Sequence, residues 1–261
     1  MYIRSCTAAL PLLILTARPA FSQTSVGVTP ASSAKLSTNK RSDWEAKYTN
    51  YMNGPTFSQS SGSSVNHFFW LKYRKNDWAV GGVFRPDTLF EAKNTRTVQG
   101  DSFLTLTTPD LFKNQHGVRS YVDIRYALPL SEESQRAERI GMLEPRFYSL
   151  YNTGNFEFSN IAIPKVFINK KPLADQKMAA LGDYLNVSYR IVKQFCFDFG
   201  VYPVWTFSRG SGSSFNNLLS YPGFTVDFSE KVALSAYVET PLLKLESKTT
   251  SLGALLSAKF L

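Results

Sequence analysis

Two histidines are the side chains best suited to acid–base chemistry near neutral pH: His67 in NHFFW and His116 in NQHGVRS. A hydrolase built on a β-strand needs a hydroxyl beside the imidazole on the same strand face, typically two residues further on. Phe69 and Val118 occupy those two positions. Neither histidine has a local nucleophile, so we expect one at the end of a strand, the other in a turn, and no enzymatic activity.

Metal, redox and nucleotide chemistry also lack a suitable set of side chains. Cys6 and Cys196 are the two cysteines, and with two separated histidines they form no cluster with metal-binding spacing. The glycine-rich GSGSS at 210–214 is typical of a loop and opens no helix after a strand. The net charge of +9 is spread along the chain instead of forming one basic patch. We therefore expect no cofactor, no metal site and no nucleic-acid partner.

Charged side chains recur instead at every second position of strand-like segments. In GVRSYVDIRYALPL (117–130), Arg119 and Asp123 share one parity, whereas Val122 and Ile124 share the other. A period of two places the two sets on opposite faces of a β-strand. The candidate site residues are the charged members of this polar face: Lys72, Arg74, Arg85, Arg119, Asp123, Arg125, Arg146, Arg190, Asp198 and Asp227.

The segment QFCFDFGVYPVWTFSRG (194–210) shows the clearest alternation of an aromatic face with a more polar one. Phe195, Phe197 and Phe199 fall on one face, and Asp198 falls between them on the other. The alternation alone does not say which face is the inside. A soluble sandwich would bury the aromatic face, whereas a barrel in a membrane would expose it to lipid.

Stepping along the chain, the period of two recurs in twelve segments of strand length. We predict strands at 44–53, 64–75, 78–87, 101–108, 117–129, 141–152, 155–168, 179–192, 195–207, 217–228, 231–242 and 250–261. Tight connections such as Asn76–Asp77 mostly follow even-numbered strands, and long loops follow odd-numbered ones. A two-residue Asn76–Asp77 turn would pair Arg74 with Ala79, and a three-residue turn at 192–194 would pair Ile191 with Phe195 and Arg190 with Cys196.

Three parts of the chain differ in composition. Residues 1–22 combine Arg4, an apolar stretch and a small–x–small site, which predicts a secretory signal peptide. Residues 23–43 are polar and aperiodic, which predicts a flexible leader. Residues 44–261 carry all twelve predicted strands. Removing the signal peptide would remove two arginines and no acids.

The export signal, the alternating strands, the short-turn and long-loop pattern and the ending SLGALLSAKFL resemble a bacterial outer-membrane β-barrel protein of the small, porin-like class. The resemblance covers residues 44–261 and implies an all-β fold: a transmembrane, antiparallel, up-and-down barrel of about twelve strands. It also implies an outer-membrane location, lipid around the barrel, and insertion machinery that reads the last strand near Phe260.

In such a barrel the charged face would line the lumen, because Arg or Lys facing lipid near the midplane costs about 2–4 kcal/mol. We therefore expect a narrow passive channel for small solutes, with a preference for anions. The alternative is a structural or surface-contact barrel whose salt-bridged interior is closed. SEESQRAERI (131–140) predicts a short helix capped by Ser131, which either folds into the mouth or lies outside it.

Overall fold

The computed structural model describes residues 43–56, 63–90, 95–114, 116–171, 176–243 and 249–260. The predicted signal peptide (1–22) and all of the predicted leader except Asp43 lie outside these residues, so both stay predictions. Within the described ranges, no helix is both long and apolar enough to cross a membrane.

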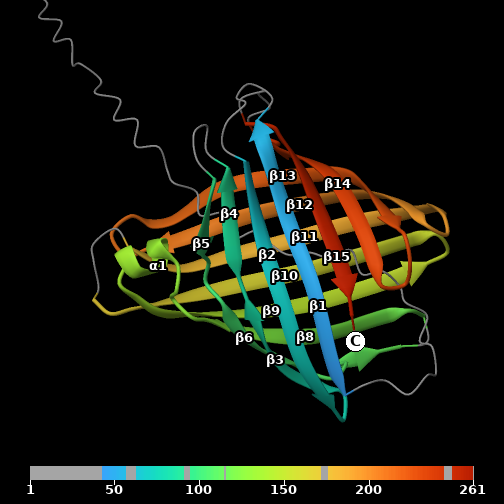
Figure 1. Cartoon of the computed structure of the whole chain (residues 1–261), viewed down its shortest axis with the longest axis horizontal. Helices are drawn as coiled ribbons and strands as arrows, with labels where there is room; N and C mark the ends of the chain where they lie inside the picture. The colour runs from blue at the N-terminus through green and yellow to red at the C-terminus, as the bar shows by residue number, and fades with distance from the viewer. Residues whose placement is uncertain are drawn as a thin grey trace, which may run out of the picture.

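Twelve antiparallel strands form one closed sheet, in which β1 pairs with both β2 and β15 (Figure 1). Their bounds are β1 (Trp44–Thr56), β2 (Ser63–Lys75), β3 (Trp78–Phe84), β6 (Phe103–Thr107), β8 (Val118–Ala127), β9 (Arg139–Thr153), β10 (Phe156–Asn169), β11 (Lys177–Val192), β12 (Phe195–Ser208), β13 (Gly212–Asp227), β14 (Val232–Pro241) and β15 (Ser251–Lys259). Closure leaves no unpaired edge among these twelve strands, as spanning a bilayer requires.

Three short strands add to the wall: β4 (Pro86–Phe90), β5 (Thr95–Gln99) and β7 (Phe112–Lys113). β3 and β4 pair with successive parts of β2. β5 pairs with β4 and forms a hairpin with it. The prediction of a loop from residue 88 to 100 was therefore wrong over much of its length. Turn-forming residues such as Pro86 and Asn94 obscured a hairpin that the β2 ladder holds in place.

The hairpin turns test the predicted registers. Arg74 pairs with Ala79 as expected, and Asn76 and Asp77 have φ of 48° and 66°, the positive values that a two-residue hairpin turn requires. In the β11–β12 hairpin, Arg190 pairs with Cys196 as expected. The pairing of Ile191 with Phe195 was wrong, because the register shifts beside this turn and Val192 pairs with Phe195.

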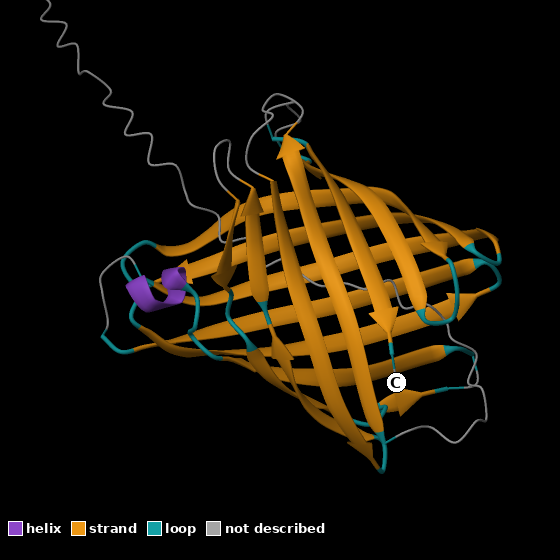
Figure 2. Ribbon diagram, viewed as in Figure 1, coloured by secondary structure: helices purple, strands orange, loops and turns teal. Residues whose placement is uncertain are grey.

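The two ends of the barrel differ. The turns of the β9–β10, β11–β12 and β13–β14 hairpins lie at one end, on the right in Figure 1. The helix α1 (Glu132–Arg136) lies at the opposite end (Figures 1 and 2). We call these the turn end and the loop end. The prediction of a long loop at 208–216 was wrong in its extent. β12 ends at Ser208, β13 already begins at Gly212, and a tight turn joins the two strands.

β12 shows which face is the inside. Phe197 and Phe199 are about two-fifths exposed on the outer surface, while Cys196 and Tyr202 of the opposite parity are buried. The same holds on β2, where Phe69 and Leu71 are exposed and Phe68 is buried. The aromatic face therefore points outward, which suits a wall surrounded by lipid and a polar interior.

The predicted helix is present and capped as expected. The Ser131 side chain accepts a hydrogen bond from the Ser134 backbone N–H at 3.2 Å. Asp101, which precedes β6, fixes this cap, because its carboxylate accepts from the Ser131 N–H at 2.8 Å and from the Ser134 hydroxyl at 2.5 Å. The helix is thereby tied to the wall at the loop end.

Candidate channel lumen

One side of the interior is filled by buried charged residues on β2, β8, β9 and β10. Asp123 on β8 stands at the centre of the first group, with Lys72 Nζ at 3.5 Å and Arg125 Nε at 2.7 Å from its carboxylate oxygens. Thr107 donates a further hydrogen bond to Asp123 at 2.7 Å. None of the three charged side chains is more than 14% exposed.

Glu144 on β9 holds a second group of the same kind. It forms ion pairs with Arg146 and, at 3.0 Å, with Lys165 on β10. Across the β8–β9 ladder, Asp123 pairs with Arg146 and Arg125 pairs with Glu144, so opposite charges face each other. We call the six residues of both groups the ion-pair cluster: Lys72, Asp123, Arg125, Glu144, Arg146 and Lys165. Four are basic and two acidic, which leaves it a formal charge of +2.

Aromatic rings complete the filling on this side. The Arg125 guanidinium lies 5.1 Å from the centroid of Trp70 and 5.3 Å from that of Phe103. Tyr121 and Tyr148 stack with centroids 4.5 Å apart and planes 6° from parallel. Long charged side chains and rings thus occupy the space inside β2, β6, β8 and β9.

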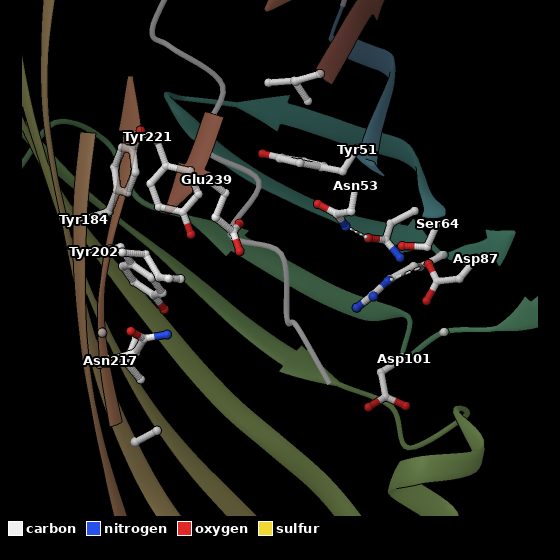
Figure 3. A pocket seen from close by; sticks show the side chains of 18 of the residues that line it. Tyr51, Asn53, Ser64, Asp87, Asp101, Tyr184, Tyr202, Asn217, Tyr221 and Glu239 are labelled. Carbon is white, nitrogen blue, oxygen red and sulfur yellow. Dashed lines mark hydrogen bonds and ion pairs between the residues drawn. The ribbon is translucent and has the colours of Figure 1, made fainter. Parts of the chain in front are cut away.

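The described residues leave open space along the inner faces of β11–β15 and, toward the loop end, across to β1, β2 and β4. A cavity of about 780 Å³ lies toward the loop end, and we call it the loop-end cavity. Tyr184, Tyr202 and Tyr221 line it from β11–β13, facing Asn53 and Asp87 on the opposite wall (Figure 3). The cap residue of α1 and the first two residues of the helix line its mouth, so the helix narrows this entrance.

The tyrosines lie against the wall because glycines leave room for them. A Cβ on Gly182 would overlap the ring of Tyr202, and a Cβ on Gly200 would overlap the ring of Tyr184. Such a cross-strand ring over a glycine covers the bare backbone. The rings therefore cover the wall here, and the loop-end cavity lies in front of them.

A second cavity, of about 380 Å³, lies toward the turn end; we call it the turn-end cavity. Glu157, Arg190 and Asp227 line it, together with Lys47 and Lys259 from the strands around the barrel closure. Arg190 Nη1 is 3.2 Å from Asp227 Oδ2. Arg190, a candidate lumen residue from the sequence, therefore lines this cavity as part of an ion pair.

The two cavities share four lining residues: Asp198, Thr225, Ser235 and Leu255. These residues come from β12–β15 and mark the place where the cavities meet, which we call the junction. Thr225 donates a hydrogen bond to Asp198 at 2.6 Å and lies 2.8 Å from the Ser235 hydroxyl. Small hydroxyl side chains and one carboxylate thus line the junction, opposite the bulky ion-pair cluster.

Charges of both signs line the cavities in nearly equal number. The basic lining residues are Arg85, Arg96, Arg139, Lys165 and Lys177 at the loop end and Lys47, Arg190, Lys231 and Lys259 at the turn end. The acidic ones are Asp87, Asp101, Glu132, Glu133 and Glu239 at the loop end, Glu45, Glu157, Asp227 and Glu230 at the turn end, and Asp198 in both. Among the described residues of the two linings, nine basic residues therefore stand against ten acidic ones.

The ten candidate residues fall into three groups. Those that line a cavity are Arg85, Arg190, Asp198 and Asp227. Those held in the ion-pair cluster are Lys72, Asp123, Arg125 and Arg146. The remaining two form ion pairs elsewhere: Arg74 with Glu45, and Arg119 with Asp110. Every basic residue of the ten thus has an acidic partner, since Arg85 also pairs with Asp87 at 3.0 Å.

The sequence reasoning missed the residues that complete these groups. Glu144 lies two residues before Arg146, so the period of two would have placed both on the inner face. Lys165 follows Pro164, which made the alternation of that strand look broken. The tyrosines Tyr184 and Tyr202 share the polar parity of their strands but carry no charge, so a search for charged residues passed over them.

His67 has polar partners that sequence spacing does not show. Its Nδ1 lies 2.7 Å from the Tyr48 hydroxyl and its Nε2 lies 3.2 Å from the Thr88 hydroxyl, across two strand pairs. No carboxylate is among these contacts, which link β1, β2 and β4 along the wall. The described residues also contain no group of three His, Cys, Asp or Glu side chains placed to bind a metal.

Comparisons with known proteins bear on the barrel as a whole. No protein-family model matches the chain, and no curated protein matches it. Among solved structures, the COG4313 outer membrane channel from Pseudomonas putida F1 aligns over 85% of this chain and 97% of its own, with a TM-score of 0.58 and 11% identity. The fold is that of an outer-membrane channel barrel.

Two porins give the same result. The NanC porin aligns over 83% of this chain and 99% of its own, with a TM-score of 0.54 and 6% identity. The KdgM porin has the same coverage, a TM-score of 0.50 and 9% identity. At these identities the similarity concerns the fold, and it confirms the antiparallel barrel of about twelve strands expected from the sequence.

Proposed function

We propose that this barrel is a passive channel of the outer membrane for small solutes. The observation that carries the proposal is the pair of cavities along β11–β15, which meet at the junction and together reach toward both ends of the barrel. Their sizes are within the range of sites that admit small organic molecules. Solved structures named as channels and porins share the fold, which supports the same reading.

In this proposal a solute diffuses along one wall of the barrel. It enters past α1, moves along the tyrosines of the loop-end cavity, crosses the junction and leaves through the turn-end cavity. The ion-pair cluster narrows the route by occupying the opposite side. No step requires an energy source, because solutes follow their own concentration gradients.

The membrane setting is part of the same proposal. Lipid would surround the aromatic outer face, and the outer-membrane insertion machinery would read β15 and Phe260, which is 61% exposed after the last strand. β1 begins and β15 ends at the turn end, where Lys47 pairs with Lys259. Both ends of the barrel segment would then lie on the periplasmic side.

The anion preference expected from the sequence is not part of this proposal. It rested on the basic residues of the lumenal face, and each of these candidate residues has an acidic partner. The ion-pair cluster has a formal charge of +2, but its side chains are held in buried ion pairs and none of them lines the junction. Ion selectivity therefore needs a separate argument from the junction itself.

The alternative is a structural barrel with a closed interior. The ion-pair cluster favours it, since such networks cross-link the strands that carry them. The alternative predicts that no solute passes the junction, and the two functions differ in this one property.

Conductance of the purified full chain in planar bilayers tests the proposal. Discrete current steps are expected, and Ser235→Trp should reduce them strongly because the indole would fill the junction. Leu234→Trp is the matched control, since Leu234 is the next residue of β14 and points outward, 37% exposed. Protein that migrates as a heat-modifiable barrel and yet gives no steps would contradict the channel.

A further inference from the structure

Asp198 is the one charged side chain that lines both cavities among the described residues. The other three junction residues, Thr225, Ser235 and Leu255, are neutral. A solute that crosses from one cavity to the other must therefore pass this carboxylate. In a narrow passage with low-dielectric walls, the field of a single fixed charge is focused onto the route.

The carboxylate is held by hydroxyl groups. Ser188 donates a hydrogen bond to Asp198 Oδ1, and Thr225 donates to Oδ2. Asn186 supports Ser188 through a hydrogen bond of 2.9 Å. These contacts fix the side chain without neutralising it, and no basic group of the described chain lies within ion-pair distance of Asp198.

Neighbouring inward-facing charges leave the junction negative. Glu157, Ser188 and Asp198 follow one another across β10, β11 and β12 on the same face. Arg190 is the basic residue nearest in register, and it pairs with Asp227 at 3.2 Å. Arg190 and Asp227 offset each other in this pair, so these neighbours do not cancel the charge of Asp198.

The rest of the lumen gives no strong opposing bias. The described residues of the cavity linings include nine basic and ten acidic ones, and each basic candidate residue is in an ion pair. The cluster's charge of +2 is spread over side chains no more than 14% exposed, none of which lines the junction. Because the charge of the cavity linings nearly cancels, the charge at the junction, which every crossing ion passes, has the largest influence on which ions pass.

We propose that Asp198 is the selectivity-determining residue of the channel and makes the junction prefer small cations to anions. This inference rests on the proposed channel function. The carboxylate and the hydroxyls of Ser188, Thr225 and Ser235 present oxygen atoms, which are the ligands that alkali cations prefer when they lose part of their water. No basic side chain among the described residues lines the junction, so these residues offer an anion no positive partner there.

The reversal potential of the full-length barrel in a potassium chloride gradient tests this assignment. The wild-type channel should be more permeable to potassium than to chloride. Asp198→Asn should lower that permeability ratio by roughly three-fold or more, because the substitution removes the one charge that the described residues place at the junction. Asp198→Glu should retain the preference.

Asp183→Asn is the matched control, since it makes the same chemical change on the neighbouring strand. Asp183 alternates with Gly182 and Tyr184, which line the loop-end cavity, and its side chain pairs with Asn160 at 2.5 Å. It therefore faces away from the lumen, and its replacement should leave the reversal potential unchanged.

Each outcome separates the inference from the function on which it rests. A conducting channel that prefers chloride, or an Asp198→Asn channel with the wild-type reversal potential, would overturn the role of Asp198 and leave the channel standing. A folded barrel without conductance would overturn both. If Asp198→Asn fails to form a heat-modifiable barrel, the wild-type and Asp198→Glu ratios still decide, because chloride preference in either would refute the assignment.

Discussion

Polar residues alternate into the lumen on both sides of the barrel, but their side chains fill the space on one side and leave cavities on the other. On β2 and β8–β10, inward positions carry long side chains such as Lys72, Arg125 and Arg146, which fill the space and pair with Asp123 and Glu144. On β11–β15, many inward positions carry Gly, Ser or Thr, and the tyrosine rings lie flat over glycines against the wall. These side chains leave cavities beside them. A polar inner face therefore does not by itself mean an open one. Side-chain volume decides whether the lumen is filled.

The largest expected effect comes from breaking the filled side. Glu144→Gln would leave Arg146 and Lys165 buried without their shared partner, which typically costs about 3–5 kcal/mol. We expect the free energy of unfolding, measured by urea titration in lipid vesicles, to fall by that amount. Glu132→Gln is the control, because its pair with Arg136 is exposed and worth at most about 1 kcal/mol. Equal stability of the two variants would show that the cluster does not hold the barrel together.

A second substitution would fill part of the loop-end cavity, as the long charged side chains fill the space on the other side. Gly200→Val places a branched side chain where the Tyr184 ring lies, so the ring must move away from the wall. Because the loop-end cavity is lined by this ring, we expect single-channel conductance to fall several-fold while the barrel still forms. Gly154→Val is not a usable control, since Gly154 has a φ of 56°.

The better control is Ala162→Val, which adds the same branched side chain on the outer face of β10. Ala162 pairs with Asp183 and Phe147 in the strand ladders, on the outward parity. Its conductance should equal that of the wild type. A Gly200→Val channel with unaltered conductance would mean that the tyrosine face does not bound the route.

The smallest effect is expected at the rim. Arg119 pairs with Asp110 and is 51% exposed, so solvent screens this ion pair. Arg119→Ala should change the free energy of unfolding by less than about 1 kcal/mol and leave the reversal potential unaltered. A marked change in ion selectivity would show that this residue, predicted from sequence as pore-lining, does contact the route.

The architecture was accessible from sequence because a strand's two faces are encoded by a period of two. The twelve barrel strands, the outward aromatic face of β12 and the Asn76–Asp77 turn follow from alternation and turn chemistry. The hairpin β4–β5 was not predicted because its segment contains turn-forming residues. Pairing of β4 with β2 overrides their local preference.

The lumen was less predictable, for a physical reason. Parity places Arg146 and Asp198 on the same inner face, but one is buried in an ion pair and the other lines both cavities. The difference depends on which strands face each other across the barrel and how far side chains reach. Tilt and stagger set these distances, and a single strand's pattern does not contain them.

Thiol labelling tests most directly the central claim that the route follows β11–β15 and avoids the filled side. In a Cys196→Ser background, Ser235→Cys would place a thiol at the junction, and Thr105→Cys would place one on β6, where Thr105 is 2% exposed opposite Arg125. A charged, water-soluble methanethiosulfonate reagent should reduce the current through the Ser235→Cys channel and leave the Thr105→Cys channel unchanged. Block at Thr105→Cys, with no effect at Ser235→Cys, would contradict the account.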